Sequence, residues 1–281
     1  MLKINEEETI EIILNFIKQY VEKAGKKSIV IGLSGGVDSA VVAKLATMAL
    51  GKENVFALFL PEISTPLKDF EHTFLMAKML KIDYKIIDLS PIIHSIVNAC
   101  NETNEVVLGN IKARLRMLFL YQQANLRNAL VCGTSNKTEL LIGYFTKYGD
   151  GGSDFLPIGD LYKTQVYQIA EYIGIPEEII KKPPTAGLWK GQTDEGELGI
   201  SYKKLDIILY CLERKMNIER IARLANIDRN EVIRIYDMVK ESEHKRRLPP
   251  VAKIGFRTVG IDWRFPLEME GRYDKGFNNE E

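Results

Sequence analysis

The chain has 281 residues, and its 38 lysines and arginines balance its 38 aspartates and glutamates. Because the net charge is zero, nothing draws the chain as a whole toward nucleic acid or an anionic membrane, and we expect neither as a partner. The acidic start MLKINEEETIEII is unlike a signal peptide, and no apolar stretch approaches the ~20 residues of a membrane span, so we expect a cytoplasmic protein.

The first half of the chain shows alternating helix and strand patterns. An amphipathic helix is predicted from about Ile10 to Gly25, because its apolar residues recur at helical spacing. Strands are predicted at 28–33, 55–60, 83–89 and 128–133, and helices at about 37–50, 66–80, 92–99 and 105–126. This alternation indicates βαβ units. We therefore expect the α/β class, with a parallel sheet in a Rossmann-like three-layer α/β/α arrangement.

The second half of the chain differs in composition. Residues 143–160 and 183–199 are rich in Gly, Pro and Asp without periodicity, which predicts long loops. Helices are predicted at about 163–173, 202–215, 218–225 and 229–243. We treat residues 1–281 as a single domain, with a parallel-sheet core at about 28–175 and a loop and C-terminal helices at about 176–270 packed on it.

The segment GLSGGVDS at 32–39 directly follows the first predicted strand. It fits neither G-x-G-x-x-G nor G-x-x-x-x-G-K-[ST]. Its glycines allow backbone N–H groups to approach an anion, its two serines add donors, and Asp38 suits Mg²⁺ bound to phosphate. The alternative is that Asp38 or Ser39 only caps the next helix. A cap, however, leaves the glycine pair and the two serines unexplained.

The motif S-G-G-x-D-S resembles the pyrophosphate loop of the ATP pyrophosphatase group, whose members cleave ATP between the α and β phosphates. Four further segments narrow the resemblance to ammonia-dependent NAD synthetase: GTSNKTE (133–139), YGDGGSDFLPIGDLYKTQ (148–165), PTAGLWKGQTDEGELGISY (184–202) and HKRRLPP (244–250). Together the resemblance spans about residues 28–250.

This resemblance implies a ligase that performs the last step of NAD biosynthesis. ATP adenylates the nicotinate carboxylate of deamido-NAD and releases pyrophosphate, and ammonia then displaces AMP. No covalent enzyme nucleophile is expected, which agrees with the lack of a Cys/His or Ser/His/Asp arrangement. Ammonia is the expected nitrogen donor, because a fused amidase domain would need ~250 further residues. A separate amidase partner stays open.

The resemblance also implies roles for individual residues. The expected ATP contacts are Gly32, Leu33, Ser34, Gly35, Gly36, Val37, Asp38, Ser39, Thr134, Lys163 and Thr185. The expected Mg²⁺ ligands are Asp38 and Glu139, and the expected deamido-NAD contacts are Arg114, Lys147, Asp154, His244 and Lys245. The helix at about 105–126 is expected at a homodimer interface where the substrate site is shared, and the 183–199 segment is expected to close over the adenylate.

Two other functions stay open. The target of ATP activation could be a tRNA base, as in thiolating or lysine-attaching relatives, although the chain lacks their basic face and cysteine pairs. The chain could also bind a nucleotide without turnover. Cys100, Cys132 and Cys211 form no C-x-x-C pair and are interpreted as core residues, and His72 and His94 as structural residues.

Overall fold

The computed structural model describes residues 2–101, 104–189 and 191–263. Its centre is a four-stranded sheet in the order β3-β2-β1-β4, with every neighbouring pair parallel. The strands are β1 (Ile29–Gly32), β2 (Val55–Phe59), β3 (Asp83–Ile86) and β4 (Leu130–Cys132). The chain moves outward from β1 to β3 and then returns to place β4 on the other side of β1. This reversal opens a crevice beyond the carboxyl ends of β1 and β4, where ligands bind in such folds.

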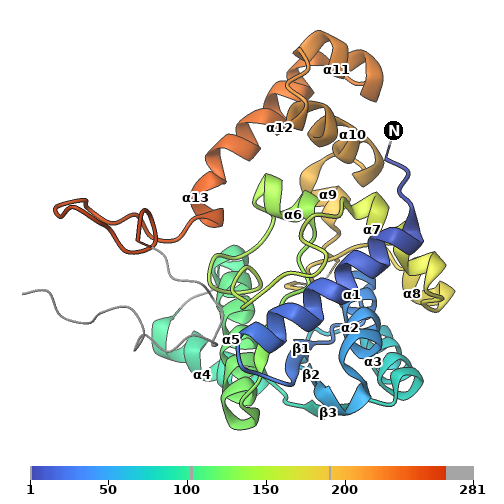
Figure 1. Ribbon diagram of the computed structural model, residues 1–281, viewed down its shortest axis with the longest axis vertical. Helices are drawn as coiled ribbons and strands as arrows, with labels where there is room; N and C mark the ends of the chain where they lie inside the picture. The colour runs from blue at the N-terminus through green and yellow to red at the C-terminus, as the bar shows by residue number, and fades with distance from the viewer. Residues whose placement is uncertain (1, 102–103, 190, 264–281) are drawn as a thin grey trace, which may run out of the picture.

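Helices cover both faces of the sheet (Figure 1). Ile29 and Ile31 of β1 pack with one group of helices, and Val30 packs with the other, as the two-residue period of a strand requires. The first group comprises α1 (Glu6–Lys23), α2 (Val37–Leu50), α3 (Leu67–Leu80) and α7 (Lys163–Tyr172), and the second comprises α4 (Ser90–Cys100) and α5 (Glu105–Arg127). The predicted three-layer α/β/α fold is confirmed.

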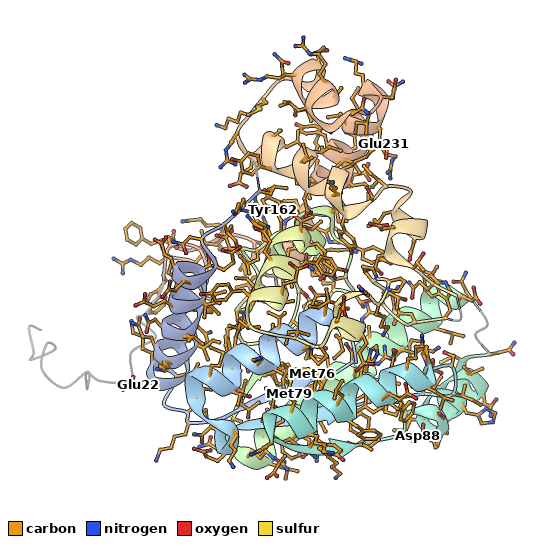
Figure 2. The ribbon with its side chains drawn as sticks, turned by 90° about the vertical axis from the view of Figure 1, so that its right-hand side faces the viewer. Glu22, Met76, Met79, Asp88, Tyr162 and Glu231 are labelled. Carbon is orange, nitrogen blue, oxygen red and sulfur yellow. The ribbon has the colours of Figure 1, made fainter. Side chains whose placement is uncertain are left out.

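The C-terminal helices form a second apolar cluster beside the sheet-bearing part. They are α10 (Tyr202–Glu213), α11 (Ile218–Ala225) and α12 (Arg229–Glu241), followed by the short α13 (Glu243–Arg246). Figure 2 shows Tyr162 at the boundary between the two parts and Glu231 at the far end of the C-terminal helices. Buried Tyr162 and Ile142 belong to the C-terminal cluster, so the residues just before α7 and the end of α6 (Lys137–Ile142) tie the two parts together. This part was predicted to span about residues 176–270, and residues 264–270 lie outside the described residues.

The predicted elements match the observed ones except where helices are short. The patterns gave no indication of α6, α8 (Glu177–Ile180) or α9 (Asp194–Leu198), because four to six residues are too few for a helical period. The prediction that all cysteines lie in the core is wrong for Cys100, which is exposed. Ile93 is the buried residue of α4, so this helix lies at the surface and its last residue faces solvent.

No helix among the described residues is long and apolar enough to cross a membrane.

The 32–39 loop turns the chain from β1 into α2. Gly35 has a φ of +76°, and a Cβ there would lie 2.8 Å from the Asp69 carbonyl oxygen, so only glycine fits. His72, buried beneath the loop, lies 3.2 Å by its Nδ1 from the Gly35 carbonyl oxygen. The N-cap residue of α2 is Gly36, without a capping side chain, so neither Asp38 nor Ser39 caps the helix. Ser39 Oγ instead donates to the Gly36 carbonyl, which closes the loop.

The substitution Gly35→Ala should destabilise the protein by about 2–5 kcal/mol, the sum of about 1–2 for a left-handed alanine and about 1–3 for overlap with the Asp69 backbone. The matched control is Gly36→Ala, because Gly36 has a φ of −96° and its Cβ would meet only Ser34 Oγ at 3.5 Å. Urea unfolding measures both. Equal stability of the two variants would contradict this account of the loop.

Candidate active site

A cavity of about 450 Å³ opens at the carboxyl edge of the sheet, between the 32–39 loop, α5 and the 183–199 segment. Twelve predicted site residues line it: Gly32, Leu33, Ser34, Gly36, Val37, Asp38, Ser39, Thr134, Glu139, Lys163, Thr185 and Lys245. Gly35 is placed behind them, against the backbone of Asp69. The cavity therefore unites nearly the whole predicted ATP site.

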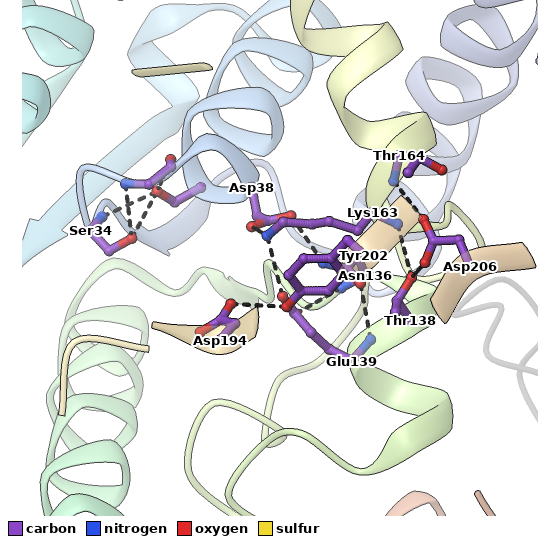
Figure 3. A network of polar contacts seen from close by, with 12 residues as sticks. Ser34, Asp38, Asn136, Thr138, Glu139, Lys163, Thr164, Asp194, Tyr202 and Asp206 are labelled. Carbon is purple, nitrogen blue, oxygen red and sulfur yellow. Dashed lines mark hydrogen bonds and ion pairs between the residues drawn. The ribbon is translucent and has the colours of Figure 1, made fainter. Parts of the chain in front are cut away.

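A buried charge cluster lies at one wall of this cavity (Figure 3). The Nζ atom of Lys163 lies 2.5 Å from Asp38 Oδ2 and 3.5 Å from Glu139 Oε1, and the lysine side chain is 2% exposed. The three residues come from the first turns of α7, α2 and α6. One ammonium group thus compensates two carboxylates from separate parts of the chain.

Asn136 fixes the two carboxylates relative to each other. Its side-chain nitrogen donates to Asp38 Oδ1 at 3.1 Å, while its side-chain oxygen accepts from the backbone N–H of Glu139 at 3.0 Å. The Glu139 carboxylate in turn accepts from the Asn136 backbone N–H at 3.2 Å, so the pair forms a capping box at the start of α6. Asn136 is fully buried, and its amide therefore holds one geometry.

The charged groups of the cluster shift one another's pKa values. Burial and the nearby Asp38 charge raise the pKa of Glu139 above its ordinary value of 4.5, while Lys163 opposes this shift. Burial alone would lower the pKa of Lys163, but Asp38 and Glu139 raise it above its ordinary value, so the lysine stays charged. The cluster is therefore a buried cation between two carboxyl groups that compete for it.

The 183–199 segment is held over the cavity at several points. Lys112 of α5 donates to the Leu188 carbonyl at 2.7 Å and pairs with buried Glu62 at 3.1 Å. Tyr202 of α10 donates to Asp194 at 2.9 Å, and the Tyr202 ring centroid lies 5.2 Å from Lys163 Nζ. The segment thus contacts both the mouth of the cavity and the surroundings of the charge cluster.

Most predicted deamido-NAD contacts lie outside the cavity. Arg114 is on the exposed side of α5 and donates to the Lys147 carbonyl at 3.2 Å, while Lys147 Nζ donates to the His244 carbonyl at 2.9 Å. These three residues form one basic group at the surface. Lys245 does line the cavity and donates to the Gly143 and Phe145 carbonyls.

Asp154 forms hydrogen bonds at the edge of the sheet in this structure. Its Oδ2 accepts from the Val131 backbone N–H at 2.6 Å, and its Oδ1 accepts from the Tyr121 hydroxyl at 3.1 Å. Both carboxylate oxygens are thus engaged beside β4. The residue holds the loop after Gly149 against the edge of the sheet, where Cys132 and Phe155 form a parallel bridge.

Sequence reasoning missed several residues of the site. Asn136 had a detectable signal, because N-x-x-E before an apolar run is typical of a capped helix start. Arg116, which lines the cavity and donates to the Leu60 carbonyl at 3.3 Å, lies in a helix with several other basic residues, and nothing in the pattern singles it out. Asp206, fully buried on α10, is visible in the sequence only as an acid among apolar neighbours.

The donor set fits a magnesium ion of the kind that phosphates carry. Two carboxylates at one cavity wall are what Mg²⁺ takes from a protein when phosphate oxygens and water fill its other positions. Within the described residues, no group of three or more His, Cys, Asp or Glu side chains is arranged to hold a metal by itself. The site therefore suits a metal that arrives with its nucleotide.

The comparisons with known proteins identify the family of the chain. The family model described as NAD synthase matches residues 9–249. The NH(3)-dependent NAD(+) synthetase of Pyrococcus horikoshii is 51% identical over 245 residues, which cover 86% of this chain and 93% of that protein.

Two solved structures have the same fold. The NH3-dependent NAD synthetase from Campylobacter jejuni has a TM-score of 0.77 at 36% identity, and the match covers 89% of this chain and 100% of that chain. The NMN synthetase from Francisella tularensis has a TM-score of 0.80 at 34% identity, with 90% and 100% covered. The family model matches most of the chain, and the chain therefore belongs to the NAD synthase family.

Proposed function

We propose that this chain converts deamido-NAD to NAD with ATP and ammonia, and that the cavity described above binds the ATP. The observation that carries the site assignment is the meeting of Lys163, Asp38 and Glu139 beside the 32–39 loop. Family membership supports the reaction, because the match to the NH(3)-dependent NAD(+) synthetase of Pyrococcus horikoshii covers 93% of that protein.

The reaction divides into two substitutions. First, a carboxylate oxygen of deamido-NAD attacks the α-phosphorus of ATP, and the bond to the β-phosphate breaks to release pyrophosphate. The carboxylate then carries AMP as a leaving group. Ammonia attacks the carbonyl carbon, AMP departs, and the nitrogen loses one proton to give the amide. Because the substrate supplies the nucleophile, the protein acts by positioning the reactants and by stabilising charge on the phosphates.

The residues of the cavity suit these tasks. The backbone of the 32–39 loop leads into the start of α2, where N–H groups favour an anion. Asp38 and Glu139 would hold Mg²⁺, which neutralises phosphate charge. Lys163 would then be released from Asp38 and would donate to the phosphate oxygens. The 183–199 segment would exclude water, which would otherwise hydrolyse the adenylate.

The test is NAD formation from deamido-NAD, ATP and Mg²⁺, followed with a coupled dehydrogenase. We expect NAD with ammonium and none with glutamine as the nitrogen source. Nicotinic acid mononucleotide serves as a second acceptor, because one structural neighbour is an NMN synthetase. Faster turnover of the mononucleotide, or pyrophosphate release without NAD, would contradict the proposed substrate.

The substitution Lys163→Met should have opposite effects on two properties. kcat/KM for ATP should fall about 10- to 150-fold, because a charged hydrogen bond contributes about 1.5–3 kcal/mol. Affinity for Mn²⁺ without nucleotide should rise, because the ammonium that occupies the space between Asp38 and Glu139 is gone. Electron paramagnetic resonance of free Mn²⁺ measures the second effect.

The matched control is Lys181→Met, which removes a lysine from an exposed pair with Glu177 and should change neither property. Weaker Mn²⁺ binding in the Lys163 variant would contradict the idea that the lysine and the metal compete for the same carboxylates.

We also propose that two copies of the chain pair through α5. Ala113, Arg116 and Met117 line the cavity, whereas Arg114 and Leu118 lie on the exposed side of the same helix. Leu118 is 58% exposed and Val107, on the same stripe, is 41% exposed. Because Arg114 points away from its own cavity, a role in substrate binding fits a site that a second copy completes.

A charge placed on this stripe should separate the copies. Leu118→Asp should give a monomer in sedimentation velocity and should lose NAD synthesis, because Arg114 would no longer reach a partner's cavity. Leu224→Asp adds the same charge to the exposed side of α11 and should change neither. A Leu118 variant that sediments as a monomer yet retains full activity would refute the shared site.

A further inference from the structure

Asp206 is a buried carboxylate that the proposed chemistry does not use. It lies on α10, is 0% exposed, and forms no ion pair within the described part of the chain. Its Oδ1 accepts from the Thr138 hydroxyl at 2.6 Å, and its Oδ2 accepts from the Thr164 backbone N–H at 2.8 Å. Burial raises the pKa of Asp206 above its ordinary value, although its donors and the nearby Lys163 charge lower it, so a carboxyl group at this place is costly and packing alone does not explain it.

The two donors belong to the helix starts that carry the charge cluster (Figure 3). Thr138 directly precedes Glu139 in α6, and Thr164 directly follows Lys163 in α7. The Thr138 hydroxyl oxygen also accepts from the Lys163 backbone N–H at 2.9 Å. Asp206 and Thr138 thus bind the first two N–H groups of α7 and fasten them to α6.

The start of α7 needs such external partners. The first four N–H groups of a helix have no partner inside it, and the N-cap Tyr162 supplies no capping side-chain acceptor. A negative charge at this end is favourable because of the helix dipole. Asp206 therefore caps α7 from a distant helix, and through Thr138 the same carboxylate sets the distance between α6 and α7.

A second contact places α10 at the same cluster. Tyr202, at the start of α10, has its ring beside Lys163 and its hydroxyl on Asp194 of the 183–199 segment. One helix of the C-terminal part therefore contacts the segment over the cavity, the lysine, and the two helix starts. Packing alone would not require polar contacts from one helix to all of these.

We propose that Asp206 is a positioning residue, which holds the starts of α6 and α7 so that Glu139 and Lys163 meet the metal and the phosphates of ATP in the correct geometry. This inference rests on the proposed ATP site. Arg114, Lys147 and His244 lie elsewhere, so Asp206 should affect the ATP side of the reaction and not the binding of deamido-NAD.

The test is Asp206→Asn, which keeps the volume and one acceptor oxygen but removes the charge. The probe is α,β-methylene-ATP with Mn²⁺, because this analogue resists cleavage at the bond that the reaction breaks. We expect its affinity to fall about 10- to 100-fold, the usual effect of removing a partner that orients a metal ligand. The affinity for deamido-NAD should be unchanged, and both are measured by calorimetry on the full chain.

Two further variants separate positioning from folding. Leu209→Ala, on the same helix and 1% exposed, should lower the unfolding temperature through lost packing and should leave analogue affinity unchanged. Thr138→Val removes the hydroxyl that joins Asp206 to α6 and that also accepts from the Lys163 backbone N–H, so it should lower the analogue affinity at least as far as Asp206→Asn does. Thr138→Ser should retain the wild-type affinity.

Three results would overturn the proposal. They are unchanged analogue affinity in Asp206→Asn, an equal loss of affinity for deamido-NAD, or a loss in Leu209→Ala that matches its thermal destabilisation. The measured affinities and unfolding temperatures do not depend on catalytic turnover. A wild-type protein that binds the analogue but makes no NAD would overturn the proposed reaction and leave the positioning role of Asp206 supported.

Discussion

The arrangement of the site depends on one buried interaction, the ammonium group of Lys163 held between Asp38 and Glu139. Removing one partner from such a group leaves an uncompensated charge, which typically costs about 3–5 kcal/mol. The cluster must therefore stay complete or exchange one cation for another. Replacing the ammonium group with a divalent metal ion that arrives with phosphate would keep both carboxylates compensated, and it would leave the lysine available to the nucleotide.

The fold supplies this cluster from helix starts rather than from strands. The turns after β1 and β4 bring Asp38 and Glu139 to the crevice, and α7 brings Lys163 from beyond the sheet. Asn136 links the first two, and Asp206 joins α6 to α7. The C-terminal helices thus contact the charge cluster through α10, although they contribute no strand and pack as a separate apolar cluster.

The features that could be predicted from the sequence were those that local patterns or the family resemblance indicate. Strand and helix periods predicted the parallel sheet, and the glycine-rich turn indicated where an anion would bind. The pairing of Lys163 with Asp38 spans 125 residues, and no local pattern encodes it. Asp206 could not be predicted for the same reason, because its partners lie 68 and 42 residues away. Nor could the sequence predict on which side of α5 Arg114 lies. Tertiary packing decides these contacts, and the helix period of α5 alone leaves its orientation open.

A crystal structure with α,β-methylene-ATP and Mn²⁺, using anomalous scattering to locate the metal, tests the central claim most directly. We expect one Mn²⁺ between Asp38 and Glu139, with Lys163 Nζ moved from Asp38 to a phosphate oxygen. A metal bound by other residues, or a lysine still paired with Asp38 beside a bound nucleotide, would contradict the exchange of one cation for another.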